Sequence, residues 1–227
     1  MTNRLILTVA VLGGTGRIGA ALAQRWARAG YYVILGSRQQ SKAQQVADEL
    51  NARLGRPAIR GMTNEAAAAS CDIAVLTVPY AAHASTLEAV KDRLSARLLV
   101  DVTVPIDNKR NSVASRPAAG SAAQEAQAIL GARANVAAAF HNVSYEHVRD
   151  DEAVPCDILV CADGDEARAQ TLQLVAAAGM VGWDAGALAN AAVVEGLTAI
   201  LIGINRRYKI RGAGIRITGV PADAASP

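Results

Sequence analysis

Residues 5–19 read Leu-Ile-Leu-Thr-Val-Ala-Val-Leu-Gly-Gly-Thr-Gly-Arg-Ile-Gly, and this stretch decides the fold. An apolar, β-branched run ends in a cluster of glycines, and a helical pattern follows at once. Gly14, Gly16 and Gly19 give the spacing G-x-G-x-x-G between a predicted strand and a predicted helix, the context in which this pattern indicates a dinucleotide site. We expect Gly14 to permit a tight turn, Gly16 to let a pyrophosphate approach the backbone, and Gly19 to let helix and strand pack closely.

The start of the helix after this turn is the predicted phosphate site. The first N–H groups of a helix have no partner within the helix, and together with the helix dipole they favour an anion. Thr15 lies inside the turn and can donate a further hydrogen bond to phosphate. The predicted cofactor-binding residues at this point are Gly14, Thr15, Gly16, Arg17 and Ile18.

Apolar segments alternate with amphipathic ones along the rest of the chain, which predicts a parallel sheet covered by helices on both faces. We predict further strands at 31–35, 57–62, 72–78, 98–104 and 135–140, and helices at 16–29, 41–54, 63–70, 83–94 and 121–130. Residues 107–120 are polar and irregular and are expected to form a loop near the ligand. Thr63 is the expected N-cap of its helix.

The pattern changes after residue 146, where 147–154 is charged and resembles a linker. Beyond it we predict strands at 157–161, 181–184 and 214–218, and helices at 165–178 and 187–206. The fold class is therefore α/β, a Rossmann-like doubly wound parallel sheet with a small C-terminal α/β lobe. The predicted domains are 1–146 for dinucleotide binding, 147–220 as the small lobe, with a mostly apolar helix for dimerisation, and 221–227 as a disordered tail.

Composition limits the partners. The 227 residues carry a formal net charge of +3, and the one basic cluster, 206–211, is interpreted as a solvated helix end, so we expect no nucleic acid. No apolar run reaches the roughly 20 residues of a membrane span, because Glu195 interrupts the longest one, so we expect no membrane. The three cysteines, Cys71, Cys156 and Cys161, show no Cys-x-x-Cys spacing and are expected to be reduced in the cytoplasm. No metal site is expected.

The end of the second strand predicts the choice of dinucleotide. NAD enzymes place a carboxylate there, about 20 residues after the glycines, to bind the ribose 2′-hydroxyl. This chain has Gly36-Ser37-Arg38 instead, with Lys42 one turn later. Ser37 can donate to a 2′-phosphate and Arg38 can pair with it, which favours NADP over NAD.

Two further turns, Thr77-Val78-Pro79 and 102–105, are expected to wall the nicotinamide, because the carboxyl ends of parallel strands line the ligand crevice. The sequence lacks the Tyr-x-x-x-Lys of short-chain dehydrogenases. Of its histidines, His83 opens a helix and His147 lies in charged sequence, so only His141 is expected at the crevice, as a site residue or as a structural one. The lack of an acid–base pair favours a reaction that depends mainly on orientation, such as hydride transfer between two bound cofactors.

At this point the chain resembles, over nearly its whole length, the NADPH-dependent reductases of the deazaflavin coenzyme F420, or F420H2:NADP oxidoreductases. The resemblance rests on Gly13-Gly14-Thr15-Gly16 with Gly19, Gly36-Ser37-Arg38, Asp-Ile-Ala-Val-Leu-Thr-Val-Pro at 72–79, Ala-Phe-His-Asn-Val at 139–143, Val-Glu-Gly-Leu-Thr at 194–198 and Gly-Ile-Asn-Arg-Arg-Tyr at 203–208.

The resemblance implies a cytoplasmic, usually dimeric oxidoreductase that moves a hydride between NADP(H) and coenzyme F420. It also implies that the 1–146 domain binds NADP and that the 147–220 lobe serves deazaflavin binding. His141, Val143, Gly196 and Thr198 are then expected to line the deazaflavin pocket, with His141 orienting the ring or assisting a proton. One position departs from the family pattern: Ala192 stands where an arginine is expected to help hold the anionic coenzyme. Reduction of an ordinary flavin, an imine or a ketone, or NADP sensing without turnover, are the alternative functions.

Overall fold

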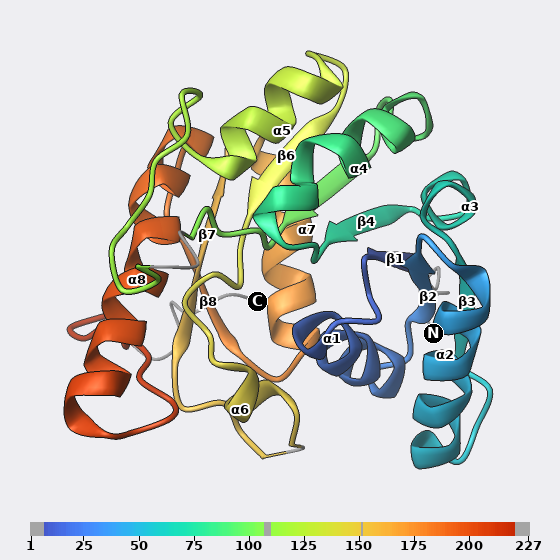
Figure 1. Cartoon of the computed structure of the whole chain (residues 1–227), viewed down its shortest axis with the longest axis horizontal. Coiled ribbons are helices and arrows are strands. Elements are labelled where there is room, and N and C mark those ends of the chain that lie inside the picture. The colour runs from blue at the N-terminus through green and yellow to red at the C-terminus, as the bar shows by residue number, and fades with distance from the viewer. Residues whose placement is uncertain (1–6, 107–109, 151, 221–227) are drawn as a thin grey trace.

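The computed structural model describes residues 7–106, 110–150 and 152–220. Its centre is an eight-stranded sheet in the order β3-β2-β1-β4-β5-β6-β7-β8 (Figure 1). The strands are β1 (Thr8–Leu12), β2 (Tyr32–Ser37), β3 (Ile59–Thr63), β4 (Ile73–Leu76), β5 (Leu98–Asp101), β6 (Asn135–Ala138), β7 (Asp157–Ala162) and β8 (Val181–Asp184). All neighbours are parallel except β6 and β7. The Rossmann-like α/β prediction is confirmed.

Helices cover both faces of the sheet because successive strand residues point to opposite sides. In β1, Val9 and Val11 belong to one buried cluster with Trp26, whereas Ala10 and Leu12 belong to a second cluster on the other face. The first cluster includes residues of α1 (Arg17–Arg28), α2 (Gln40–Leu54) and α7 (Asp165–Ala177). The second includes residues of α3 (Asn64–Ala69), α4 (His83–Val90), α5 (Ala122–Leu130) and α8 (Ala191–Tyr208).

Short elements complete the chain and agree with the local capping signals. Three 3-10 turns cover Tyr80–Ala82, Lys91–Arg93 and Leu188–Asn190, and α6 covers Tyr145–Val148. Thr63 is the N-cap of α3 as predicted, since its Oγ1 accepts the Ala66 N–H at 3.2 Å. Ser121 caps α5 in the same way.

The segment interpreted as a linker is tied to the first helix. The buried guanidinium of Arg25, in α1, donates to the carbonyls of His147, Val148, Asp150, Glu152 and Ala178. Trp26 adds an Nε1–H bond of 2.8 Å to the Leu174 carbonyl in α7. The sheet also runs from β6 into β7 and β8. The boundary at residue 146 stays a prediction, and 221–227 lies outside the described residues.

The predicted last strand at 214–218 is wrong, because these residues belong to no strand of the structure. The Asp157 N–H donates to the Ile215 carbonyl at 2.8 Å, as a strand partner would. The Ile217 N–H, however, donates to the Asp157 carboxylate at 2.8 Å instead of to a backbone carbonyl. A side chain therefore takes the place of the next ladder bond.

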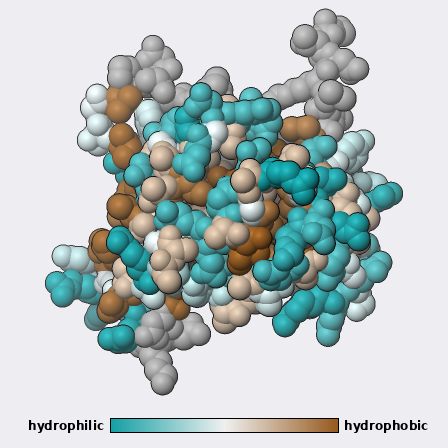
Figure 2. Space-filling model, turned by 90° about the horizontal axis from the view of Figure 1, so that it is seen from above, coloured by the Kyte–Doolittle hydropathy of each residue, from teal (hydrophilic) through white to brown (hydrophobic). Residues whose placement is uncertain are grey.

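One segment, Leu188–Tyr208, is long and apolar enough to cross a membrane by length and composition, with a hydropathy of 1.6. Its Glu195 is only 2% exposed and accepts two backbone N–H bonds from the start of α5. Because the Glu195 carboxylate is buried and has partners in α5, α8 is a helix that packs against the rest of this fold. Its outer face still carries exposed apolar side chains, and Figure 2 shows hydrophobic residues along that side of the molecule.

Candidate functional site: a dinucleotide turn facing a histidine loop

The glycine turn between β1 and α1 is built by close backbone contacts. Gly13, not Gly14, adopts the left-handed conformation of the tight turn, with φ of +71°, which corrects the predicted role of Gly14. The Gly14 N–H donates to the carbonyls of Val11 and Gly36, at 3.1 and 3.0 Å, and so joins β1 to β2. A Cβ on Gly14 would lie 2.6 Å from the Val11 oxygen. Gly14 thus lacks a side chain because two strands meet there.

Gly19 and Gly16 differ in what surrounds them. A Cβ on Gly19 would lie 2.5 Å from Thr77 Oγ1, so α1 packs directly on the end of β4. A Cβ on Gly16 would meet nothing closer than 3.7 Å. Gly16 is the N-cap of α1, makes no side-chain cap bond, and is followed by a first turn without an acidic residue. The protein fold does not require a glycine at position 16, whereas a ligand lying against the backbone does.

Asn64 fixes the glycine turn through a hydrogen bond. The sequence analysis did not predict this role. Asn64 Oδ1 accepts the Gly13 N–H at 3.1 Å, and the side chain is only 6% exposed. A Cβ on Gly36 would lie 2.7 Å from the same oxygen. Asn64 begins α3, directly after the Thr63 cap. Its position in a capping sequence hides this role, because the contact partner lies 51 residues away.

The end of β2 presents the residues predicted to bind a 2′-phosphate. Ser37 is the last residue of β2, and its Oγ accepts the Gln39 N–H at 3.3 Å. Arg38 and Lys42 are exposed and follow it directly, and the first turn of α2 has no acidic residue. Two cations and a hydroxyl beside a helix start without a carboxylate suit a phosphate group.

The two turns expected to wall the nicotinamide, 77–79 and 102–105, are fixed by hydrogen bonds of their threonine hydroxyls. Thr77 Oγ1 donates to the Leu12 carbonyl at 3.1 Å, so this hydroxyl supports β1 and is not free for a ligand. Val78 lies against the glycine turn, where a Cβ on Gly13 would lie 2.4 Å from its Cγ1, and Pro79 is exposed. Thr103 Oγ1 lies 3.5 Å from the Val78 carbonyl and connects the turn after β5 to the turn after β4.

His141 follows a strained residue at the end of β6. Phe140 has φ of +66°, a rare conformation for a bulky residue, and its ring packs edge-on against Trp26 at 5.9 Å. Such strain persists where the surroundings fix it, and it is found at functional sites. His141 is 3% exposed, and neither ring nitrogen has a hydrogen-bond partner in the described part of the chain.

Burial decides the charge of His141. It lowers the pKa of His141 to about 4, and the opposing effects of the Asp101 carboxylate and backbone are smaller. The imidazole is therefore neutral at pH 7. It can donate one hydrogen bond and accept another, which suits orienting a ring, but it is not a reservoir of protons at neutral pH.

Of the other residues predicted for the deazaflavin, Thr198 bonds to His141 directly. Thr198, on α8, donates its Oγ1–H to the His141 carbonyl at 2.6 Å, and Gly196 lies two positions earlier on that helix. Val143 is half-buried and packs on the first buried cluster. Asn142, which the sequence analysis missed, donates to the Asp157 carbonyl at 2.6 Å and leaves its buried Oδ1 without a partner among the described residues.

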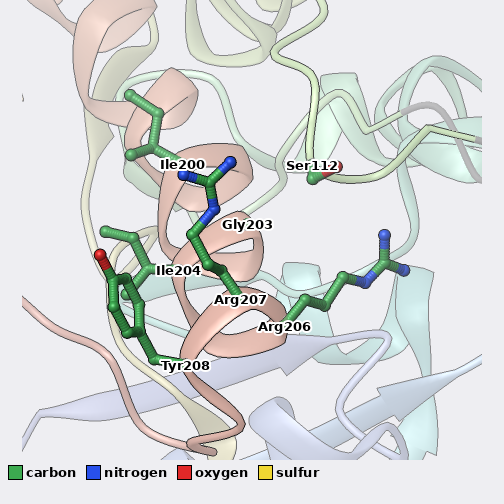
Figure 3. A pocket seen from close by; sticks show the side chains of 7 residues that line it. All are labelled: Ser112, Ile200, Gly203, Ile204, Arg206, Arg207 and Tyr208. Atoms are coloured by element: carbon green, nitrogen blue, oxygen red, sulfur yellow. The ribbon is translucent and has the colours of Figure 1, made fainter.

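The two halves of the site are neighbours in space. The Arg17 guanidinium, in the first turn of α1, lies 5.9 Å over the ring of Tyr145, which begins α6 directly after the His141–Ser144 loop. A separate hollow lies at the last turns of α8, where Arg206 and Tyr208 point to opposite sides of the helix and Ser112 faces it (Figure 3). It contains none of the predicted site residues.

Glu195 makes the stability of the fold depend on pH. Burial raises its pKa to about 7, although the N–H bonds from Ala122 and Ala123 act in the opposite direction. A carboxyl whose folded pKa lies above its unfolded value stabilises the fold more as pH falls from about 7 toward the ordinary glutamate pKa of 4.5. We expect the native protein to gain roughly 2 to 3 kcal/mol in unfolding free energy, relative to Glu195→Gln, between about pH 8 and about pH 5.

Urea unfolding of both proteins at the two pH values measures this difference. His141 opposes the effect at low pH, since its pKa is lowered to about 4, but it is present in both proteins and cancels in the comparison. Parallel pH profiles for the native protein and Glu195→Gln would show that the Glu195 carboxyl does not titrate in this range.

The open glycine turn, the carboxylate-free end of β2 and the histidine loop define a Rossmann-type NADP-dependent oxidoreductase. A family profile described as "NADP oxidoreductase coenzyme F420-dependent" matches residues 8–105. The F420-dependent NADP reductase of Methanothermobacter thermautotrophicus is 40% identical to this chain, covering 97% of this chain and 99% of that protein. The Methanocaldococcus jannaschii protein of the same name is 34% identical, covering 94% and 99%. The chain belongs to the F420-dependent NADP reductase family.

A solved structure agrees with this at the level of the fold. A crystal structure from Arthrobacter sp. FB24, with a provisional assignment as an F420-dependent NADP-reductase, has a TM-score of 0.80. It is 21% identical and covers 93% of this chain and 99% of its own length. The fold of most of the chain therefore matches that of a solved structure.

Proposed function

We propose that this protein transfers a hydride between NADP(H) and coenzyme F420 in the crevice between the glycine turn and the His141 loop. F420-dependent NADP oxidoreduction is the activity of its family. Two features together support this location. Gly16 leaves open space at the start of α1, and His141 and Asn142 have buried polar atoms without a hydrogen-bond partner among the described residues. Buried polar groups without protein partners are rare and point to a ligand.

For NADP(H), the fit rests on the open backbone at Gly16 and on the cations after β2. The first N–H groups of α1 hold the pyrophosphate, with Thr15, Arg17 and Ile18 around it. Ser37, Arg38 and Lys42 hold the 2′-phosphate. The turn of Val78 and Pro79 forms an apolar wall beside the nicotinamide, and Thr77 keeps that wall attached to β1.

For coenzyme F420, the fit rests on the polar atoms that the fold leaves unpaired. The neutral His141 ring and the Asn142 amide orient the deazaflavin, Val143 gives apolar contact, and Gly196 leaves room beside α8. Thr198 fixes the His141 backbone through its hydroxyl. When both molecules are bound, the nicotinamide C4 and the deazaflavin C5 supply the hydride chemistry. The protein contributes orientation and a dry cleft.

Arg38→Ala tests the cofactor assignment. A charge-assisted pair to phosphate is worth about 1.5 to 3 kcal/mol, and the exposure of Arg38 places it at the lower end, so the Michaelis constant for NADPH should rise about tenfold. The constant for NADH should change little, because NADH has no 2′-phosphate. Steady-state kinetics with both cofactors measure this, and equal losses with both would refute the assignment.

A panel of acceptors tests the function itself. NADPH oxidation is followed with coenzyme F420, with FMN or FAD, and with a cyclic imine and a ketone as acceptors. The proposed function predicts turnover with coenzyme F420 well above that with the others. Faster turnover with a flavin, imine or ketone would support the rival reductases, and tight NADP binding with no turnover would support a sensor.

We further propose that the protein is a homodimer built largely on α8. Val193, Ile200 and Tyr208 on this helix are 65%, 56% and 68% exposed, and these apolar side chains need a cover. A second copy of the same face supplies it in an isologous contact. Light scattering at micromolar protein should give the mass of a dimer, and a monomer mass would contradict the proposal.

A cytoplasmic location is part of the same proposal. Cys71, Cys156 and Cys161 are free and buried, and burial raises the pKa of Cys156 and of Cys161 to about 11. Thiols of this kind are unreactive and suit a reducing compartment.

A further inference from the structure

A buried histidine–aspartate pair lies next to the 102–105 turn, which is expected to wall the nicotinamide. Asp101 is the last residue of β5, and His83 is the first residue of α4. Both are 0% exposed, and His83 Nε2 lies 2.7 Å from Asp101 Oδ2. An ion pair without solvent is costly to form and still more costly to break on one side. The proposed roles above do not explain why the fold contains it.

Asp101 and the residue after it form hydrogen bonds to three neighbouring segments at this edge of the sheet. Its Oδ1 accepts the Thr103 N–H at 2.9 Å and so shapes the turn at 102–105. Its carbonyl accepts the Ala139 N–H at 3.3 Å, on the segment that leads to His141. The next residue, Val102, donates its N–H to the Leu76 carbonyl at the end of β4, at 3.0 Å. The carboxylate thus holds the 102–105 turn, while the backbone of Asp101 and Val102 joins that turn to the histidine loop and to the end of β4.

Two carboxylates face His83 and favour its protonated, imidazolium form. Burial lowers its pKa, but the hydrogen bond and charge of Asp101, followed by those of Glu125, outweigh burial and raise it. Glu125 Oε1 on α5 lies 3.6 Å from Nδ1, and its Oε2 accepts the Tyr80 hydroxyl at 2.7 Å. A cation at the start of a helix is unfavourable, so these partners compensate for the dipole of α4. The imidazolium thereby connects α4, β5 and α5.

We propose that His83 is a positioning residue for hydride transfer, which fixes the Asp101 carboxylate and, through it, the 102–105 turn that walls the nicotinamide. This rests on the proposed function. The residue does not reach the reacting atoms; it acts through the Asp101 bond to the Thr103 N–H. A misplacement of about 1 Å in such a wall can cost up to about a hundredfold in rate.

Three variants separate positioning from simple stability. His83→Leu leaves Asp101 buried without its partner, so both the melting temperature and kcat with coenzyme F420 should fall, the latter about 10- to 100-fold. His83→Gln keeps a donor for Oδ2 and should retain most of kcat. His83→Leu combined with Asp101→Leu removes both charges, so it should recover thermal stability, yet kcat should stay low because Thr103 has lost its acceptor.

The isotope effect on kcat with C4-deuterated NADPH distinguishes the two roles, because a loss of stability alone does not change it. The isotope effect should rise in His83→Leu and in the double variant, because hydride transfer becomes slower. The NADPH dissociation constant should change less than about threefold, because the phosphate contacts lie elsewhere. His147→Leu is the matched control: this histidine also bonds a carbonyl, of Gly212 at 2.8 Å, away from the wall, and its isotope effect should equal that of the native protein.

Recovery of kcat together with stability in the double variant would overturn the proposal, as would native turnover per folded molecule in His83→Leu. A native protein that does not reduce coenzyme F420 would instead overturn the proposed function, so the two failures are distinguishable.

Discussion

Gly16→Val is expected to weaken NADPH binding by at least about a hundredfold while the protein stays folded. Gly16 has φ of −76° and ψ of 164°, a conformation open to any residue, and a Cβ would meet no protein atom closer than 3.7 Å. The side chain therefore fits the free protein but occupies the space where the pyrophosphate must approach the N–H groups of α1. Fluorescence titration with NADPH and a thermal melt measure the two effects.

Gly164→Val is the matched control for this change. Gly164 is the N-cap of α7, also in an extended conformation, and a Cβ there would lie 3.8 Å from the nearest atom. Both variants should lose a similar, small amount of thermal stability, but only Gly16→Val should lose NADPH. If both variants bind NADPH as the native protein does, the phosphates do not lie on the start of α1.

Ala192→Arg has the second largest expected effect. The resemblance predicts an arginine where this chain has Ala192, a half-buried residue in the first turn of α8. One charge-assisted contact is worth about 1.5 to 3 kcal/mol, so the arginine should tighten binding of the full coenzyme about 10- to 100-fold. Binding of a deazaflavin without the phosphate and carboxylate tail should not change, since the ring relies on His141, Val143 and the backbone near Gly196.

The native protein should accordingly bind the tailless deazaflavin almost as well as the full coenzyme. Ala187→Arg adds the same charge at an exposed position before α8, outside the proposed dimer face, and should tighten neither ligand. The measurement is a titration of both ligands against the three proteins in the presence of NADP. Unchanged binding of both ligands by Ala192→Arg would show that the tail does not pass residue 192.

The features that sequence reasoning predicted are those with a local signal. The glycine spacing, the apolar strand runs and the cap at Thr63 each act within a few residues, and the structure confirms the strands and helices built on them. For the 214–218 segment the local pattern wrongly predicts a strand, because its apolar residues resemble those of the true strands. What decides its hydrogen bonding is the Asp157 side chain, about 60 residues away.

Long-range polar contacts account for what was missed in the site. Arg25 reads as an ordinary helix residue, yet it binds carbonyls more than 120 residues away. His83 was interpreted only as the start of a helix, because its partner Asp101 lies in another element. The left-handed Phe140 has no sequence signal at all, since glycine or asparagine is the usual residue there. Periodicity describes one element at a time, and these contacts join different elements.

The most direct test of the central claim is the transfer of a label. The protein is incubated with coenzyme F420 and NADPH carrying deuterium at both C4 positions, and the reduced coenzyme is analysed by mass spectrometry and NMR. Direct hydride transfer predicts one deuterium per molecule at C5 of the reduced deazaflavin, with matching oxidation of NADPH. Reduced coenzyme without the label, or no reduction of coenzyme F420 at all, would contradict the account.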